Sequence, residues 1–199
     1  MEFFSDPIHQ PFELGNPNGA VGALLIHGFS GTPAEMRYSG QALADAGIFA
    51  KGILLPGFGS DIANLKAQSN KTWLEAAYRA WTSFQPRFET TLLIGFSMGG
   101  AIATILAADA PPNELILMAP FTRFESRLVD IILPLAQYVK PTVSPFEFGD
   151  LDDPDFRKSL LEMVPGIDLD NEETINILKE EMVLPTKVLV GVRKLGRRA

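Results

Sequence analysis

The chain alternates short apolar runs, bounded by glycine or proline, with longer segments in which apolar residues recur every three or four positions. Short bounded runs predict buried β-strands, and the three-to-four spacing predicts helices that pack on them. Strands that alternate with helices indicate the α/β class, with a mostly parallel sheet and helices on both faces. The predicted strands are residues 23–26, 53–55, 91–94, 115–118 and 187–190, with residues 12–14 as a short edge strand.

The first predicted helix has the clearest boundaries. Thr32 can cap its start, Pro33 fits the first helical position, and Glu35 completes a capping box. Gly47 should end this helix. Two further helices are predicted at residues 72–84 and 99–108.

Residues 120–184 interrupt this alternation. Prolines are frequent there, and the segment is too long for a simple crossover between strands, so we expect an inserted helical cap. Its helices are predicted at residues 125–133, 155–163 and 171–182. The predicted organisation is an N-terminal part of the core (1–119), the cap (120–184), and a last core strand with a basic tail (185–199).

Composition narrows the function mainly by exclusion. A hydrophobic fraction of 46% over 199 residues is that of one folded domain, and the net charge of −7 argues against nucleic-acid binding. The chain has no cysteine, which excludes a disulfide scaffold, a cysteine-ligated zinc and a cysteine nucleophile. His9 and His27 are too few for a poly-histidine metal site. We therefore expect no metal site.

No targeting segment is visible in the sequence. The first residues lack the basic and apolar regions of a signal peptide, and no apolar run approaches the ~20 residues of a membrane-spanning helix. With the absence of cysteine, this predicts a cytoplasmic protein without stable membrane insertion.

The strongest chemical motif is Gly95-Phe96-Ser97-Met98-Gly99, which matches G-x-S-x-G between a predicted strand and a predicted helix. A sharp strand-to-helix turn would push the Ser97 oxygen into the cleft at the carboxyl end of the sheet. Side chains two positions before and after would collide with the packed sheet, which explains the two glycines. The alternative is a glycine-rich helix start with an incidental serine. We interpret Ser97 as a nucleophile.

A second motif, His27-Gly28-Phe29-Ser30-Gly31, directly follows the strand at 23–26. A serine hydrolase must stabilise the oxyanion of a tetrahedral intermediate, and two backbone N–H groups can supply this. We predict that Phe29 and Met98 donate them. The His27 side chain is interpreted as structural, hydrogen-bonded within its own loop.

These motifs resemble the α/β-hydrolase superfamily, more narrowly its small carboxylesterase and monoacylglycerol-lipase group. The resemblance covers residues 20–190 and includes a third motif, Leu55-Pro56-Gly57-Phe58-Gly59, where relatives usually have a histidine in place of Phe58. It implies a Ser-His-Asp mechanism without a cofactor. It also implies small ester or acyl substrates, with the acyl chain under the cap.

The end of the chain departs from the family. The acid of the family follows the strand matched to residues 187–190, where Lys194 stands, and no histidine follows His27. A serine without a general base is a poor nucleophile. Three explanations stay open: a truncated or frame-shifted gene product, a pseudo-enzyme, or His9 as an unusual base. His9 is otherwise expected to be an exposed residue of the entry segment.

The predicted function is that of a serine carboxylesterase or acylglycerol lipase, impaired by the loss of acid and base. The alternative is a catalytically inactive hydrolase-fold protein that binds acyl ligands. Acyltransferase, thioesterase and lactonase chemistry would use the same serine. One apolar cluster consists of Ile131, Ile132, Leu133 and Leu135. These residues could line an acyl pocket, and core packing explains them equally well. The oligomeric state is not predicted.

Overall fold

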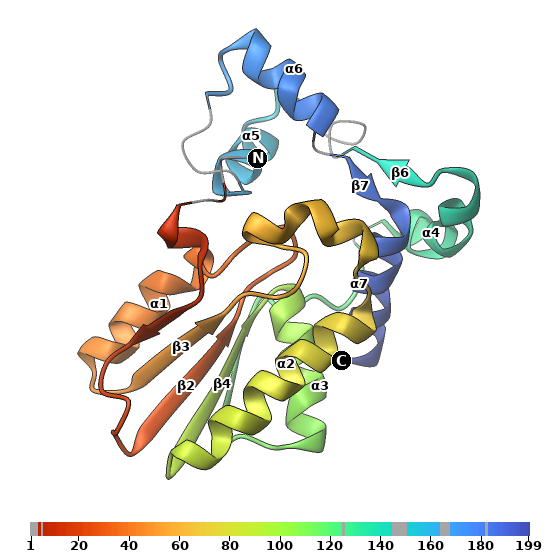
Figure 1. Ribbon diagram of the computed structural model, residues 1–199. Helices are drawn as coiled ribbons and strands as arrows, with labels where there is room; N and C mark the ends of the chain where they lie inside the picture. Colours follow the sequence, from red (N-terminus) through yellow and green to blue (C-terminus); the bar gives the residue numbers. More distant parts are fainter. Residues whose placement is uncertain (1–3, 5, 125, 145–150, 164–167, 182) are drawn as a thin grey trace.

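The computed structural model describes residues 4, 6–124, 126–144, 151–163, 168–181 and 183–199 of the chain (Figure 1). Its centre is a five-stranded sheet in the order β1-β3-β2-β4-β5, parallel except for β1, which pairs antiparallel with β3. The strands are β1 (Phe12–Leu14), β2 (Val21–Ile26), β3 (Phe49–Ile53), β4 (Thr90–Phe96) and β5 (Glu114–Met118).

Helices follow the strands in the order that the α/β class requires. The α-helices are α1 (Ala34–Asp45), α2 (Asn70–Phe84), α3 (Met98–Asp109), α4 (Arg127–Val139), α5 (Pro154–Met163), α6 (Glu172–Glu181) and α7 (Thr186–Arg198). The 3-10 segments include η2 (Pro7–His9), η3 (Gly59–Ala67) and η4 (Gln85–Arg87), and a small ribbon pairs β6 (Thr142–Val143) with β7 (Leu184–Pro185).

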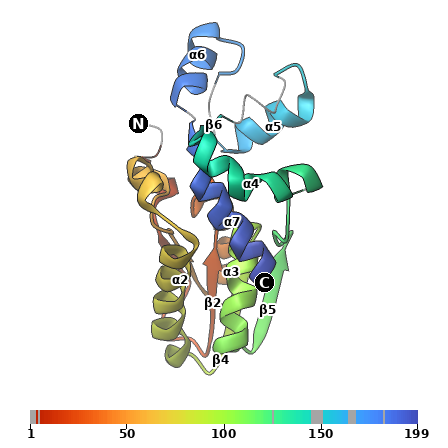
Figure 2. The ribbon, with the colours of Figure 1, turned by 90° about the vertical axis from the view of Figure 1, so that its right-hand side faces the viewer.

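Helices cover both faces of the sheet (Figures 1 and 2). Helix α1 packs on β1, β2 and β3, whereas α2 and α3 lie on the opposite face, with α7 packed outside them. The larger core cluster lies on the α2–α3 face and includes the fully buried Trp73 and Trp81. The central strands β2 and β4 have apolar residues on both faces, as expected of parallel strands covered on both sides. The predicted α/β class is therefore confirmed.

The strands predicted at 12–14, 23–26, 91–94 and 115–118 are present, and the one predicted at 53–55 is placed earlier, as β3. The first helix begins at Ala34, and the predicted capping box does not form there. Thr32 Oγ1 accepts a hydrogen bond from the Ala34 N–H (3.3 Å), but the Glu35 carboxylate turns back to accept one from the Gly28 N–H (3.0 Å). Glu35 therefore serves the preceding loop instead of its own helix start.

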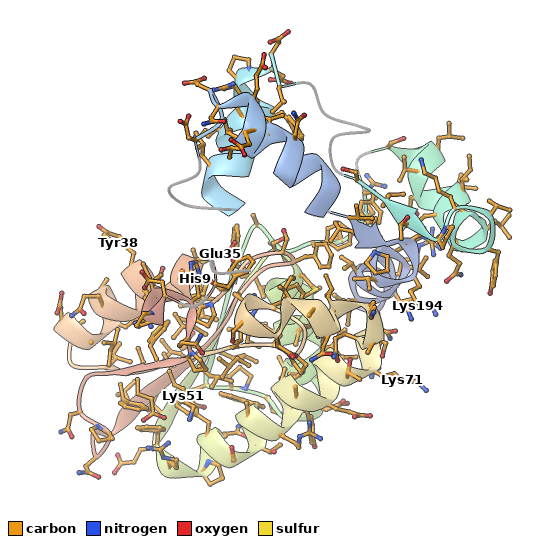
Figure 3. All side chains as sticks on the ribbon, turned by 45° about the horizontal axis from the view of Figure 1, so that its top comes forward. His9, Glu35, Tyr38, Lys51, Lys71 and Lys194 are labelled. Atoms are coloured by element: carbon orange, nitrogen blue, oxygen red, sulfur yellow. The ribbon has the colours of Figure 1, made fainter. Side chains whose placement is uncertain are left out.

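The prediction of a fifth core strand at 187–190 is wrong, because these residues lie in α7. Val188, Val192 and Leu195 recur at helical spacing and are all buried against the core. Burial also alternates from Thr186 through Val188 and Val190 to Val192, which explains why this stretch has the pattern of a strand. The predicted last strand and basic tail therefore form one amphipathic helix from Thr186 to Arg198. Lys194 is exposed within that helix and does not lie in a loop after a core strand (Figure 3).

Helices α4, α5 and α6 correspond to the three helical stretches expected between residues 120 and 184. They lie beyond the carboxyl ends of the parallel strands (Figure 2). Helix α4 continues past the predicted end through Pro134 to Val139. Residues 125, 145–150, 164–167 and 182 of the predicted cap lie outside the described residues. The three-part division of the chain stays a prediction.

Candidate active site

Ser97 occupies the single residue between β4 and α3, and its backbone has φ +49° and ψ −115°. This left-handed conformation is uncommon for a non-glycine residue. The flanking glycines permit it, because a Cβ on Gly95 would lie 2.3 Å from the Gly99 oxygen, and one on Gly99 would lie 2.2 Å from the Ile26 oxygen. The predicted sharp turn is confirmed. The predicted collision with the sheet is confirmed for Gly99, which lies against the end of β2, whereas a Cβ on Gly95 would meet the start of α3.

Three backbone hydrogen bonds fix this turn. The Ser97 N–H donates to the Met118 oxygen (3.0 Å), and the Ser97 oxygen accepts from the N–H groups of Ala101 (3.2 Å) and Phe121 (2.9 Å). The Ser97 side chain is half-buried and has no hydrogen-bond partner in the described part of the chain. No buried side-chain oxygen there lacks a partner, so solvent must reach the Ser97 hydroxyl.

The loop after β2 lies directly against this serine. A Cβ placed on Gly28 would be 3.3 Å from the Ser97 Cβ and 3.2 Å from the Phe96 ring, a tight approach that glycine allows without any shift of these neighbours. Met98 begins α3, and its N–H has no acceptor within the helix. The Phe29 N–H likewise has no hydrogen-bond acceptor among residues that the structure describes. Both predicted oxyanion donors are thus uncommitted; that they converge on one point stays a prediction.

The His27 side chain holds the loop after β2 in place through two hydrogen bonds. Its ring is fully buried, Nε2 accepts a hydrogen bond from the Leu55 N–H (3.1 Å), and Nδ1 therefore donates to the Gly28 oxygen (2.8 Å). Burial of the ring lowers the His27 pKa from 6.5 to about 4. A neutral imidazole with both nitrogens engaged cannot take a proton from Ser97. The structural interpretation of His27 is confirmed.

An aromatic cluster supports the same loop. The Phe58 ring is fully buried and packs edge-on against the rings of His27 (5.3 Å) and Phe29 (5.7 Å). The Trp73 ring contacts both Phe58 and Phe29, and its Nε1 donates to the Pro56 oxygen (3.0 Å). The phenylalanine that replaces the expected histidine of the third motif therefore has a packing role beneath the loop.

The expectation that His9 is exposed is wrong. His9 is buried, its Nδ1 lies 2.9 Å from the Thr32 Oγ1, and its ring packs against Phe4. No hydrogen bond joins it to Ser97 among the described residues. The sequence placed His9 in a turn-rich segment and gave no sign that Thr32, 23 residues later, would cover it.

Sequence reasoning missed one site residue, Glu35. Its carboxylate accepts from the Gly28 N–H, and a Cβ on Gly31 would lie 2.1 Å from its oxygen. Gly31 thus opens the path by which Glu35 reaches the loop. The seven-residue separation between Gly28 and Glu35 could not have indicated this contact, because a capping role explained the glutamate equally well.

Among the residues that the structure describes, no group of three or more histidine, cysteine or acidic side chains could hold a metal ion. No helix within the described ranges has the length and apolar character to cross a membrane.

Comparison with known proteins agrees with this geometry. A model of the alpha/beta hydrolase family matches residues 23–181. The thermostable monoacylglycerol lipase of Bacillus sp. (strain H-257) is 34% identical over 94 residues, a match that spans 47% of this chain and 38% of that lipase.

Solved structures of low sequence identity share the fold. The structure reported for the metagenome-derived lipolytic enzymes LipS and LipT superposes with a TM-score of 0.70 at 20% identity, covering 96% of this chain and 69% of that one. A monoglyceride lipase from Saccharomyces cerevisiae gives 0.63 at 15% identity, covering 94% and 64%. The family model alone matches well over half of the sequence, and the chain therefore belongs to the alpha/beta hydrolase family.

Proposed function

We propose that the chain is a serine ester hydrolase of the carboxylesterase and acylglycerol-lipase type, with Ser97 as its nucleophile. The observation that carries this proposal is the strained, solvent-accessible Ser97 at the strand-to-helix turn, with the Gly28 loop packed against it. The matched relative is a monoacylglycerol lipase, which favours small acyl esters as substrates.

The proposed reaction begins when the Ser97 oxygen bonds to the ester carbonyl carbon. The N–H groups of Phe29 and Met98 would hold the resulting oxyanion, a contribution of several kcal/mol in related chemistry. Collapse breaks the bond to the alcohol, which leaves with the proton that Ser97 has lost. Water then hydrolyses the acyl-enzyme and restores the serine.

Proton transfer is the weak step in this chain. The sequence contains two histidines, and both rings are engaged away from Ser97, His27 with Leu55 and Gly28 and His9 with Thr32. An unassisted serine attacks slowly at neutral pH. A triad enzyme stripped of its triad members retains only about 10³–10⁴-fold acceleration over water, so we expect slow turnover of esters.

The test is acylation of the purified 199-residue chain by an activated short-chain ester and by a fluorophosphonate probe. We expect labelling of Ser97, located by peptide mass, and its complete loss in Ser97→Ala. His9→Ala is the matched control and should acylate as the parent does. Loss of acylation in His9→Ala would instead make His9 the base, and labelling that survives in Ser97→Ala would refute the proposed nucleophile.

A second candidate function follows from the engaged histidines. A hydrolase-fold cleft whose serine lacks a base could bind acyl ligands without turning them over. Saturable binding of a fatty acid, with no acylation and no difference between the parent chain and Ser97→Ala, would favour this binding protein over the esterase.

A further inference from the structure

A cavity of about 330 Å³ lies where the beginning of α4 meets the end of α7. The two helices pack side by side (Figure 2). Three arginines line the cavity: Arg123 from the segment before α4, Arg127 from the first turn of α4, and Arg197 from the last turn of α7. This volume lies within the range of small-molecule sites. Neither Ser97 nor the two predicted oxyanion donors line this cavity, so it is distinct from the candidate active site.

Close packing of α7 places Arg197 in this wall. A Cβ on Gly196 would lie 2.6 Å from the Thr122 oxygen and 2.8 Å from the Phe121 ring. Any larger residue would therefore push α7 away from the segment that leads into α4. Asp130 of α4 also binds the Arg197 guanidinium (2.7 Å). The position of Arg197 is thus fixed by helix packing and by an ion pair.

The cavity has an excess of positive charge. Asp130 is the one acid that lines it among the described residues, and its carboxylate is already shared between Arg197 and Arg193 (3.0 Å). The side chains of Arg123 and Arg127 have neither an ion pair nor a hydrogen bond in the part of the chain that the structure describes. Three guanidinium groups and one carboxylate leave a formal charge of +2, on a chain whose total is −7.

An apolar wall lies beside these arginines. It is formed by Phe124 and Ile131, and the Phe124 ring packs edge-on against Phe121 (5.1 Å). Ile131 is 67% exposed, whereas Leu133 of the same apolar cluster is buried. Core packing therefore explains only part of that cluster, and Ile131 is available to a ligand. A molecule that fits this cavity has an apolar body next to an anionic group.

We propose that this cavity binds a small organic phosphate monoester. Guanidinium groups form short, charge-assisted hydrogen bonds with phosphate oxygens. The three arginines would hold the phosphate group, and the apolar wall would cover the organic part. A phosphate monoester carries a charge of about −1.5 to −2 at neutral pH, which matches the formal charge of the cavity better than the single charge of a carboxylate does.

The probe is phenyl phosphate, and isothermal titration calorimetry follows its binding to the purified 199-residue chain. We expect saturable binding by the parent. Arg123→Gln and Arg127→Gln should each weaken binding about tenfold, because each removes charge-assisted hydrogen bonds. Both side chains are exposed, so circular dichroism should show an unchanged fold. Arg197 is kept in all variants, since it also pairs with Asp130.

Arg79→Gln is the matched control. Arg79 is an exposed arginine of α2 that lines a different groove, so this variant should bind phenyl phosphate as the parent does. Ser97→Ala should also bind it unchanged, which separates this proposal from the proposed ester hydrolysis. Absence of saturable binding by the parent, or equal losses in Arg79→Gln and Arg127→Gln, would overturn the proposal.

Two related anions test the chemical class of the ligand. Inorganic phosphate lacks the apolar body, and benzoate has only a single charge. Each should therefore bind at least about tenfold more weakly than phenyl phosphate. Equal affinity for benzoate would refute the preference for a phosphate group, and equal affinity for inorganic phosphate would refute the role of the apolar wall.

Discussion

At the scale of single residues, Ser97 is a strained position whose strain has a use. Its φ of +49° costs a residue with a side chain on the order of 1–3 kcal/mol. That backbone turn also aims the hydroxyl at solvent and leaves the Met98 N–H free beside it. Stability and reactivity therefore compete at this position, and substitutions should separate them.

Ser97→Gly should raise the free energy of unfolding by about 1–2 kcal/mol, because glycine adopts this backbone at little steric cost. Ser97→Ala retains a Cβ and should show no comparable gain. Urea unfolding, followed by tryptophan fluorescence, measures both. Equal stabilities for the glycine and alanine variants would show that the turn is not strained.

His27 makes stability depend on pH. Its pKa falls from 6.5 to about 4 on folding because the ring is buried, so between these values the unfolded chain binds the additional proton. This contribution is fully present above pH 6.5 and is lost as pH falls through about 4. The difference between the two pKa values corresponds to about 3 kcal/mol of unfolding free energy.

His27→Gln provides the comparison. The variant should be less stable than the parent above pH 6.5, since a glutamine cannot reproduce both ring hydrogen bonds. The difference in unfolding free energy between parent and variant should become smaller as pH approaches 4. Urea midpoints across this window test the prediction. Parallel profiles for parent and variant would mean that His27 does not titrate as its burial requires.

Glu35 should act as a positioning residue for the Gly28 loop, since its carboxylate accepts the Gly28 N–H. Glu35→Ala should lower the acylation rate of Ser97 about tenfold or more, because misplaced oxyanion donors reduce rates steeply. Glu35→Gln retains an acceptor and should recover most of the rate. Asp45→Ala removes an exposed acid from the same helix and serves as the control. A loss of folding stability without a change in acylation rate would contradict the positioning role.

At the scale of elements, the Asp130 carboxylate joins α4 to α7 through Arg193 and Arg197. The hydrogen bond from Arg197 is the main reason that the Asp130 pKa lies below its usual value. Asp130→Asn should cost about 1–3 kcal/mol and increase hydrogen exchange in α4. The exposed pair between Arg157 and Asp170 is the matched comparison, and Asp170→Asn should cost less than about 1 kcal/mol. Equal losses of unfolding free energy in Asp130→Asn and Asp170→Asn would show that burial of the Asp130 carboxylate does not strengthen its ion pairs.

The elements that the sequence predicted well are those whose local patterns agree with their burial. Residues 91–94 and 99–108 were predictable because an apolar run ends in glycines that admit a tight turn. Residues 187–190 were not, because a four-residue apolar window reads equally as strand or helix. Val192 extends the alternation of Val188 and Val190, and only Leu195 departs from it, so the apolar positions alone do not distinguish the helix from a strand.

The active-site contacts divide in the same way. Gly95, Ser97 and Gly99 are close in sequence, and steric reasoning alone placed them. Three other contacts depend on how distant segments meet after folding. They are the hydrogen bonds between Glu35 and Gly28 and between His9 and Thr32, and the ring contact between Phe58 and Phe29. No local pattern specifies such contacts, and sequence alone could not provide them.

At the scale of the whole molecule, β5 has the composition of an interior strand in an edge position. All five of its residues are exposed, and four of them are large and apolar: Leu115, Ile116, Leu117 and Met118. Ile116 and Met118 also line an apolar groove with Tyr38 and Leu43. Such an edge favours association through its open backbone and apolar faces.

Ile116→Lys should therefore reduce self-association of the purified chain, since a charge on an edge strand opposes pairing. Tyr78→Lys is the control, because Tyr78 has a similar exposed fraction (44% against 41%) on α2. Sedimentation velocity over a range of concentrations measures the effect. Equal association of the two variants would place the contact elsewhere.

This edge strand is also tied to the serine. The Ser97 N–H is bound to the Met118 oxygen at the end of β5, and the Phe121 N–H just beyond returns a hydrogen bond to the Ser97 oxygen. Separation of β5 from the sheet should therefore lower the reactivity of the Ser97 hydroxyl, even though no residue of β5 takes part in the reaction. The fraction of molecules that a serine-directed reagent marks then becomes a reporter of the integrity of the sheet border. Ageing, heating or crowding of a sample would register first as lost reactivity, while most of the core was still intact.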